Sequence, residues 1–512
     1  MKKYPDWLKT AVFYEIYPQS FMDTNGDGIG DLQGIIVKLD YIKELGCNAL
    51  WLNPCFVSPF GDAGYDVEDY YRVAPRYGTN EDMKQLIAAC HERGMHLFLD
   101  LVPCHTAVTH PWFVASSKHE RNQYTDRFIW TDCIWHDTDG LNALRGYSER
   151  DGSAIVSFFS HQPALNYGFY EVRRPWEQPA DAEGPRETVK ELKNIMRFWL
   201  DMGIDGYRVD MAACPVKNDP EHKGTMALWT EIREMLDTEY PEAAMIAEWD
   251  QPEHSITGGF HMDFTLNGGL SNYTDLFRAE HPYFSAEGKG NAAAFMKRYL
   301  EASELSGNKG LICLISGNHD TDRLARRLHG DELKIAFAFL LTMPGAPFIY
   351  YGDEIGMRYI EGIASVEGGY GRTGSRSPMQ WDHSKNAGFS TADESGLYIR
   401  QDDAADRPDA ASQMADPDSL RNEIKRLIAL RMAHPALQAD GLPEMINSGY
   451  PLVYVRKNGD ERILVAINPS AQTNECDCAI VPAGELYRFG GQAVCDGKKL
   501  VIPGQSVLVA AF

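Results

Sequence analysis

The sequence lacks an uninterrupted apolar run long enough to cross a membrane. Its longest apolar stretch, residues 335–351, is broken by Pro344, Gly345 and Pro347, which favours a core helix, a turn and a buried strand. The first 18 residues carry two lysines but no apolar segment after them, so no secretory signal is recognisable. We therefore expect a cytoplasmic protein without a membrane partner.

Positive charge and paired cysteines are also scarce. The 49 Lys and Arg residues face 73 Asp and Glu residues, which gives a formal net charge of −24. Because nucleic-acid binding requires concentrated basic side chains, we expect no nucleic-acid partner; the charge suits a neutral substrate or a bound cation. The ten cysteines form no CxxC pair, so we expect reduced, mostly buried thiols.

Short apolar runs recur along the chain, and most are separated by helical patterns. One such helix covers residues 81–93, with Asn80 as a candidate cap. The apolar character of the runs is continuous rather than alternating, which is typical of parallel strands buried on both faces. Strand–helix alternation repeated eight times predicts an α/β fold, a (β/α)8 TIM barrel. The eight runs are 11–18, 48–54, 95–102, 203–211, 243–249, 258–264, 311–318 and 346–352.

Two segments do not fit the barrel repeat. The third and fourth strands are too far apart, and residues 104–170 between them are rich in aromatic, polar and turn residues, so we predict an inserted subdomain after strand 3. After a helix over 420–433, residues 436–512 contain short strands with turns, which predicts a C-terminal antiparallel β-sandwich domain. The barrel then comprises residues 1–103 and 171–435.

Charged residues gather where the predicted strands end, which is the catalytic face of such barrels. A single Asp after a strand is more often a turn or a helix cap, but this ensemble indicates an active site. Its carboxylates suit cleavage of a sugar acetal, where one attacks, a second protonates the leaving oxygen and a third holds hydroxyls. The residues are Asp100 and His105 after strand 3, Arg208 and Asp210 after strand 4, Glu248 after strand 5, and Asn318, His319 and Asp320 after strand 7.

Four motifs at these strand ends resemble those of glycoside hydrolase family 13, the α-amylase family. They are DLVPCH (100–105), GYRVD (206–210), AEW (247–249) and SGNHD (316–320). The similarity extends from residue 11 to about residue 435. It implies a glycosidase without an organic cofactor, acting on an oligosaccharide.

The resemblance assigns roles to three carboxylates. It implies that Asp210 is the nucleophile, Glu248 the acid/base and Asp320 the stabiliser of the transition state. A separation of about 5–5.5 Å between the first two would give retention of configuration. Arg208, two residues before the nucleophile and on the same side of the strand, would keep Asp210 ionised.

Further segments supply candidate substrate-binding residues. Residues 59–70 resemble the family loop that lines the −1 sugar site, here with Asp62 and Tyr65. Residues 161–166 and 374–382 resemble the motif that closes the insert and a segment of the oligosaccharide-cleaving branch. For Arg323 two interpretations stay open, a sugar contact or a pair with a carboxylate. The predicted substrate-binding set is Asp62, Tyr65, His105, Gln162, Arg208, His319, Arg323 and Arg376.

Two positions depart from the family pattern. Cys104 stands where the family's first motif usually has Asn, a ligand of a calcium between barrel and insert, so we do not expect that ion. Met211 follows the nucleophile, where the resemblance links Val with α-1,6 and small residues or Thr with α-1,4 specificity. The preferred linkage therefore stays open.

The loop DTNGDGIGD (23–31) predicts a different metal site. Side-chain oxygens stand at positions 1, 3, 5 and 9, glycine at 6 and a carbonyl at 7, as at the start of an EF-hand loop, although Gly34 replaces the Glu of position 12. Several family members have the same loop, whereas a plain acidic turn is the alternative. We predict one structural Ca²⁺, with Mg²⁺ less suited because it demands stricter octahedral geometry. The ligands would be Asp23, Asn25, Asp27, Asp31 and the Ile29 carbonyl.

Four functions compete. The first is a retaining α-glucosidase acting on malto-oligosaccharides or related α-glucans, and the second an endo-acting α-amylase. The third is a transglycosylase or an isomerase active on trehalose or sucrose, which needs the same residues and a site that excludes water. A non-catalytic scaffold would be expected to lack a carboxylate, but all three are present. The oligomeric state, monomer or dimer, stays open.

Overall fold

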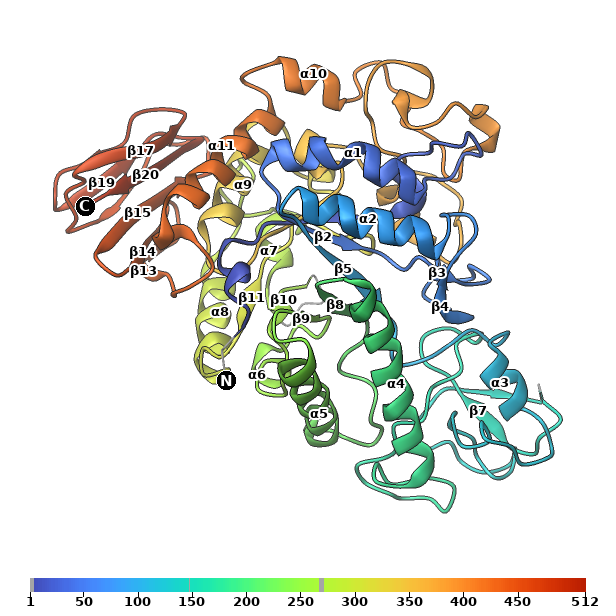
Figure 1. The fold of residues 1–512 in the computed structure, drawn as a ribbon. Helices are drawn as coiled ribbons and strands as arrows, with labels where there is room; N and C mark the ends of the chain where they lie inside the picture. Colours follow the sequence, from blue (N-terminus) through green and yellow to red (C-terminus); the bar gives the residue numbers. More distant parts are fainter. Residues whose placement is uncertain (1–3, 147, 267–270) are drawn as a thin grey trace.

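The computed structural model describes residues 4–146, 148–266 and 271–512. Within them, eight parallel strands form one sheet, in the order β11-β10-β9-β8-β5-β2-β1-β12 (Figure 1). Ile315, just beyond β11, pairs in parallel with Phe348 of β12 and closes the sheet. The (β/α)8 barrel is thereby confirmed. The strands are β1 (Phe13–Ile16), β2 (Ala49–Leu52), β5 (His96–Leu101), β8 (Gly206–Val209), β9 (Ala244–Ala247), β10 (Met262–Phe264), β11 (Leu311–Cys313) and β12 (Phe348–Tyr350).

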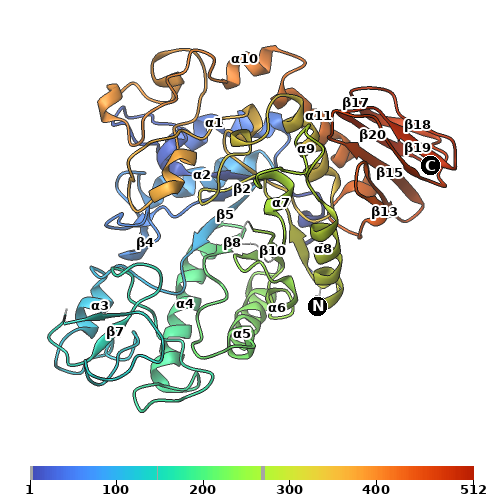
Figure 2. The ribbon, with the colours of Figure 1, turned by 180° about the vertical axis from the view of Figure 1, so that it is seen from behind.

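Helices surround this sheet (Figures 1 and 2). In α4 the buried face includes Val189, Leu192, Met196 and Trp199, spaced for one side of a helix. Gly203 ends α4 at φ +114°, a conformation that favours glycine. The helices are α1 (Leu32–Leu45), α2 (Asn80–Glu92), α4 (Glu183–Met202), α5 (Lys223–Glu239), α6 (Pro252–Ser255), α7 (Thr274–Phe277), α8 (Ala293–Leu305), α9 (Asp331–Thr342) and α11 (Leu420–Ala433).

The insert leaves the barrel after β5 and returns at α4. It contains α3 (Pro111–Ser116) and the hairpin strands β6 (Ala143–Arg145) and β7 (Ser153–Ile155), and a second short hairpin, β3 (Phe56–Val57) with β4 (Asp69–Val73), lies beside it. The insert has a small apolar core of its own, formed by Ile129, Ile155, Ala164 and Phe169. It lies at the opposite end of the molecule from the C-terminal strands (Figures 1 and 2).

The C-terminal region forms two antiparallel sheets that enclose an apolar core, as predicted for a β-sandwich. Val453 and Leu464 of one sheet share this core with Leu500 of the other. The larger sheet runs β13 (Glu444–Ser448), β14 (Leu452–Asn458), β15 (Glu461–Asn468), β20 (Ser506–Ala511), β17 (Gly484–Phe489), and the smaller β16 (Asn474–Asp477), β19 (Lys499–Ile502), β18 (Val494–Cys495). An irregular stretch with α10 (Ala410–Ala415) crosses the barrel before α11.

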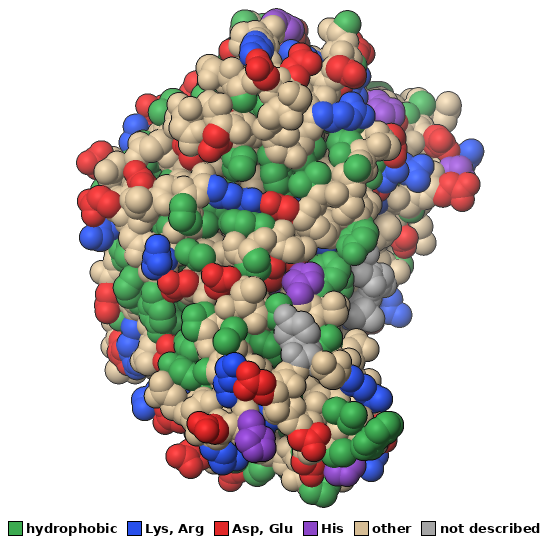
Figure 3. Space-filling model, turned by 90° about the vertical axis from the view of Figure 1, so that its right-hand side faces the viewer, with side chains coloured by type: hydrophobic (Ala, Val, Ile, Leu, Met, Phe, Trp, Pro, Cys, Tyr) green, Lys and Arg blue, Asp and Glu red, His purple; other side chains and the backbone are tan. Residues whose placement is uncertain are grey.

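Surface and thiol properties follow the composition. All ten cysteines lie in described residues, are unpaired, and six are buried. None of the helices in the described ranges combines the length and apolar character of a membrane span. On the face in Figure 3, Lys and Arg side chains are scattered among Asp and Glu rather than gathered into a basic patch.

Candidate active site

Arg208 lies at the centre of the polar cluster at the strand ends. It belongs to β8, is 1% exposed, and faces one carboxylate that follows its own strand and two from the neighbouring strands β5 and β9. Its Nη1 contacts Asp100 Oδ1 at 2.8 Å and Asp210 Oδ1 at 2.9 Å, and its Nη2 contacts Glu248 Oε1 at 2.5 Å. Parallel strands in register place these side chains at one level, because Asp100 pairs with Arg208 across β5 and β8. One guanidinium therefore positions both predicted reacting carboxylates.

A cavity of about 260 Å³ opens above this cluster. Its volume lies just below the range of about 300–1,000 Å³ typical of sites for drug-sized ligands, so it suits a small polar unit. The Met211 amide in its wall donates to Glu248 Oε2 at 2.9 Å, which fixes the second oxygen of that carboxylate. The lining residues are Asp62, Tyr65, His105, Phe158, Asp210, Met211, Glu248, Asp320 and Arg372.

The pKa values of two carboxyl groups at the site, Asp210 and Asp320, are shifted in opposite directions. Burial, and then the neighbouring Glu248 carboxylate, raise the pKa of Asp210, and Arg208 only partly opposes this. Burial alone would also raise the pKa of Asp320, but His319, Arg376 and Arg372 outweigh it and hold this pKa below its usual range.

Two arginines from one loop hold Asp320. Arg372 Nη1 and Arg376 Nη2 contact Asp320 Oδ1 at 2.6 and 2.9 Å. Arg372 Nη2 also lies 3.6 Å from Asp62 Oδ1, on the other side of the cavity. Gln162 of the insert donates to Asp62 Oδ2 at 2.8 Å, and burial raises the pKa of Asp62 to about 6. The cavity is thus bridged by an Asp–Arg–Asp chain.

A second chain of contacts supports the floor of the cavity. Tyr65 Oη lies 2.9 Å from Asp100 Oδ2 and 2.7 Å from His319 Nε2. His319 Nδ1 lies 2.9 Å from Glu15 Oε1 and 3.1 Å from Asn53 Nδ2. Burial holds the pKa of His319 well below its usual range, although the adjacent Asp320 carboxylate opposes this shift. These contacts fix the orientation of Tyr65, which lines the cavity, and of His319, which contacts Tyr65 but does not line it.

Comparison with known proteins agrees with this arrangement. Residues 15–440 match the family model of the α-amylase catalytic domain. The chain belongs to the α-amylase family. It is 31% identical to an oligo-1,6-glucosidase of Heyndrickxia coagulans over 92% of this chain and 94% of the relative. It is also 31% identical to a trehalose synthase/amylase of Mycobacterium tuberculosis, over 88% and 80%.

Solved structures give the same family. The trehalulose synthase MutB from Pseudomonas mesoacidophila MX-45 superposes with a TM-score of 0.84 at 27% identity, covering 99% of both chains. The family model and the named glucosidase relatives make this α-amylase-family protein a glycosidase with a carbohydrate substrate.

The structure brings most of the predicted site of this glycosidase together, but not Arg323. That guanidinium is fully buried, contacts Asp353 Oδ1 at 3.1 Å and donates to the Tyr351 carbonyl. It does not line the cavity; of the two open interpretations, the carboxylate pair is correct. Gln162 and Arg376 do not line the cavity either. Gln162 contacts Asp62, and Arg376 contacts Asp320.

His105 does line the cavity wall. Its Nε2 lies 3.1 Å from the Tyr65 carbonyl, and burial lowers its pKa to about 3, so the ring is neutral. Sequence reasoning missed Arg372, which lines the cavity, and Glu15 and Asn53, which support His319. Glu15 lies near the end of β1 and Asn53 directly follows β2, a signal that was available, whereas Arg372 lies in a segment without a neighbouring strand.

The acidic loop 23–31 of this family member folds back on itself. Asp23 accepts hydrogen bonds from the Gly26 and Gly28 amides at 2.7 and 2.8 Å, and Asp31 caps α1 through the Gly34 amide at 2.7 Å. Among the described residues, no three His, Cys, Asp or Glu side chains converge closely enough to hold a metal. A site here therefore depends on Asn and carbonyl oxygens as well as carboxylates.

Proposed function

We propose that this protein is a retaining glycoside hydrolase that cleaves α-glucosidic bonds in malto-oligosaccharides or related α-glucans through a covalent glycosyl-enzyme intermediate. The observation that carries the proposal is the Arg208 guanidinium bound to both Asp210 and Glu248 beneath a sugar-sized cavity. Two adjacent carboxyl groups, one to attack and one to donate a proton, are what double displacement requires.

In the first step, Asp210 attacks the anomeric carbon. The bond from that carbon to the glycosidic oxygen breaks, its electron pair stays on the oxygen, and the oxygen takes the proton of Glu248. In the second step, Glu248 accepts a proton from water, the water oxygen bonds to the anomeric carbon, and Asp210 leaves as a carboxylate. Asp320, held ionised by two arginines, stabilises the positive charge that develops on the sugar.

We further infer action at chain ends. The Asp62–Arg372–Asp320 chain crosses one side of the cavity, so a glucan cannot continue past the sugar bound there. The volume of about 260 Å³ supports a site for one sugar unit. This favours an exo-acting α-glucosidase over an endo-acting α-amylase.

Glycosyl transfer or isomerisation is a second candidate, favoured by the aromatic side chains at the rim. Phe158 lies 4.7 Å from Phe159, which lies 6.0 Å from Tyr370, measured between ring centroids. Such a rim hinders water from reaching the covalent intermediate. Chromatography of products from maltose, maltotriose, isomaltose, trehalose, sucrose and soluble starch decides: released glucose supports hydrolysis, isomeric disaccharides support transfer, and no product from any sugar refutes both.

We also propose one structural Ca²⁺ in the loop 23–31. The all-oxygen donor set of Asp23, Asn25, Asp27 and Asp31 with the Ile29 carbonyl matches the chemistry of Ca²⁺. Chelation is expected to lower the melting temperature of the wild type more than its rate at 25 °C, because an ion bound only by the folded state stabilises it. Asp27→Ala should melt lower and lose the response to chelator. Equal melting curves with and without chelator would refute the site.

A further inference from the structure

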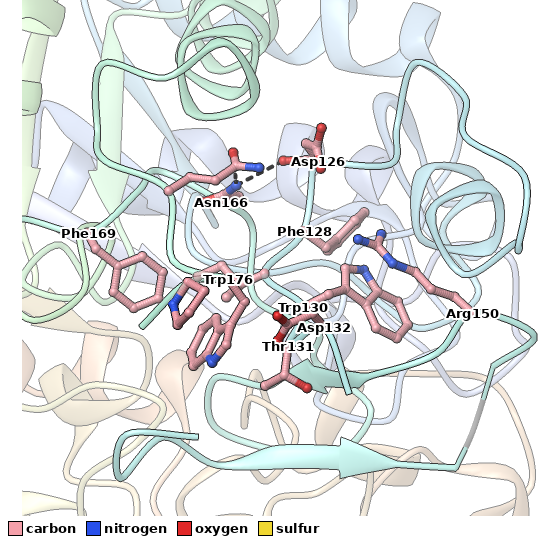
Figure 4. A pocket seen from close by; sticks show the side chains of 12 residues that line it. Asp126, Phe128, Trp130, Thr131, Asp132, Arg150, Asn166, Phe169 and Trp176 are labelled. Carbon is pink, nitrogen blue, oxygen red and sulfur yellow. Dashed lines mark hydrogen bonds between the residues drawn. The ribbon is translucent and has the colours of Figure 1, made fainter. Parts of the chain in front are cut away.

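A second cavity lies in the insert, outside the active site. It has a volume of about 210 Å³, close to the 260 Å³ of the active-site cavity. We call it the insert cavity (Figure 4). Neither the barrel strands nor the catalytic carboxylates contribute to it. Its lining residues are Asp126, Phe128, Ile129, Trp130, Thr131, Asp132, Arg150, Asn166, Phe169, Pro175, Trp176 and Gln178.

Aromatic rings and polar groups are combined in this lining. Trp176 is half-buried and packs edge-on against Phe169, with ring centroids 5.5 Å apart. Its Nε1 is buried and finds no hydrogen-bond acceptor among the residues that the structure describes. The other indole of the wall, Trp130, donates instead to Ser116 Oγ at 3.1 Å. Because a buried N–H without an acceptor is costly, Trp176 favours a ligand that brings an oxygen.

The charges in the lining disfavour an anionic ligand. Asp126 and Asp132 both line the cavity. Asp126 contacts Arg121, and Asp132 contacts His136, each at 2.6 Å, and neither of these two partners lines the cavity. The Arg150 guanidinium is engaged by the Thr125 carbonyl at 2.6 Å and lies over the Trp130 ring. A neutral ligand with an apolar face for the rings and hydroxyls for the carboxylates and the indole fits best. A sugar ring has these properties.

We propose that the insert cavity is a second carbohydrate site, which binds one glucosyl unit of an α-gluco-oligosaccharide without cleaving it. The sugar class rests on the cavity itself, and the choice of an α-glucan rests on the proposed function. One segment connects the two sites: Gln162 reaches Asp62 at the active site, and Asn166, four residues later, lines the insert cavity. Substrate held in the insert cavity is therefore kept close to the catalytic one.

Calorimetry with the inactive Asp210→Asn protein and maltotriose tests the proposal. Two binding events per chain are expected. Adding Trp176→Ala should abolish one of them, and Trp176→Phe, which keeps the ring but loses the N–H, should weaken it by about two- to tenfold. Trp135→Ala is the matched control, since Trp135 lies in the same insert but is 85% exposed, and it should keep both events.

Activity separates a binding effect from a folding defect. In an otherwise active chain, Trp176→Phe should leave hydrolysis of p-nitrophenyl α-glucoside unchanged, because this small substrate fills only the active site. A single binding event in the Asp210→Asn protein, or two events that Trp176→Ala leaves intact, would overturn the proposal. Binding of acetate or inorganic phosphate at Arg150 in place of the sugar would also overturn it. Two sugar-binding events without any α-glucosidase activity would refute the proposed function alone.

Discussion

A single buried arginine organises the chemistry at the scale of residues. Arg208 pairs with Asp100, Asp210 and Glu248 together, which lowers the cost of burying these carboxylates near one another. Burial, and then the neighbouring Glu248 carboxylate, raise the pKa of Asp210. The substrate's developing positive charge then favours ionised Asp210, which makes the nucleophile strongest when it is needed.

Removing either reacting group should stop turnover and leave the fold intact. Asp210→Asn removes the nucleophile, and Glu248→Gln removes a general acid whose contribution is about 10²–10⁴-fold. We expect each to lower kcat on maltotriose by at least that factor, with unchanged circular dichroism. Glu253→Gln, a carboxylate paired with Arg298 away from the cavity, serves as the control. Near-normal activity of either catalytic variant would contradict the assigned roles.

Asp62 makes stability depend on pH. Its pKa is raised to about 6 by burial, whereas in the unfolded chain it is near 3.9. Between pH 4 and 6 the folded state therefore binds more protons, and its free energy of unfolding falls as the pH rises.

Asp62→Asn should remove this dependence. Relative to the variant, the wild type should lose about 2 kcal/mol between pH 4 and pH 7, measured by urea denaturation. Asp393→Asn, at an exposed position, should run parallel to the wild type. Parallel curves for Asp62→Asn would show that this carboxyl keeps an ordinary pKa.

At the scale of elements, the start of α2 shows what local sequence can and cannot predict. The predicted helix exists, but Asn80 is not its cap. The Asn80 side chain instead bonds the Val73 amide and the Tyr71 carbonyl of β4 at 2.8 and 2.9 Å. Thr79 caps the helix in a capping box with Asp82. Which residue caps the helix depends here on the neighbouring strand β4, and the position of that strand cannot be predicted from residue type alone.

Thr79→Ala should destabilise the protein by about 1 kcal/mol, the usual effect of losing a cap. The Asp82 amide loses its acceptor, which lies at 3.2 Å. Urea denaturation measures the change. Thr238→Ala inside α5 is the control, because this exposed Thr caps nothing and Ala has the higher helix propensity. Equal stability of Thr79→Ala and wild type would show that Asp82 alone holds the helix start.

At the scale of the whole molecule, the sequence predicts the elements that follow a repeated local pattern. It does not predict contacts between segments that are far apart in the chain. The barrel strands, the insert and the sandwich were predictable because continuous apolar runs and turn spacing are local signals. Arg372 was not, because it reaches the cavity from a segment far from any strand end. For Arg323 the sequence left a sugar contact and a carboxylate pair open, because its carboxylate partner, Asp353, lies 30 residues away in the chain.

The junction between the barrel and the sandwich depends on a contact of this kind, between residues far apart in the chain. Arg456 of β14 is fully buried and donates to the carbonyls of Thr342 at 2.5 Å, Gln438 at 2.7 Å and Asp440 at 2.9 Å. Since Thr342 ends α9 of the barrel, one side chain satisfies acceptors on both sides of the junction. Without it, buried carbonyls lose their donors, at about 1–3 kcal/mol each.

Arg456→Ala should therefore destabilise both regions together. We expect a loss of about 3 kcal/mol that shifts one cooperative transition in calorimetry, rather than releasing the sandwich in a separate step. Arg488→Ala on β17 is the matched control, because its pair with Glu485 is exposed and such pairs contribute about 0–1 kcal/mol. Two resolved transitions in Arg456→Ala would show instead that the sandwich is stable by itself and that the junction adds little to its folding.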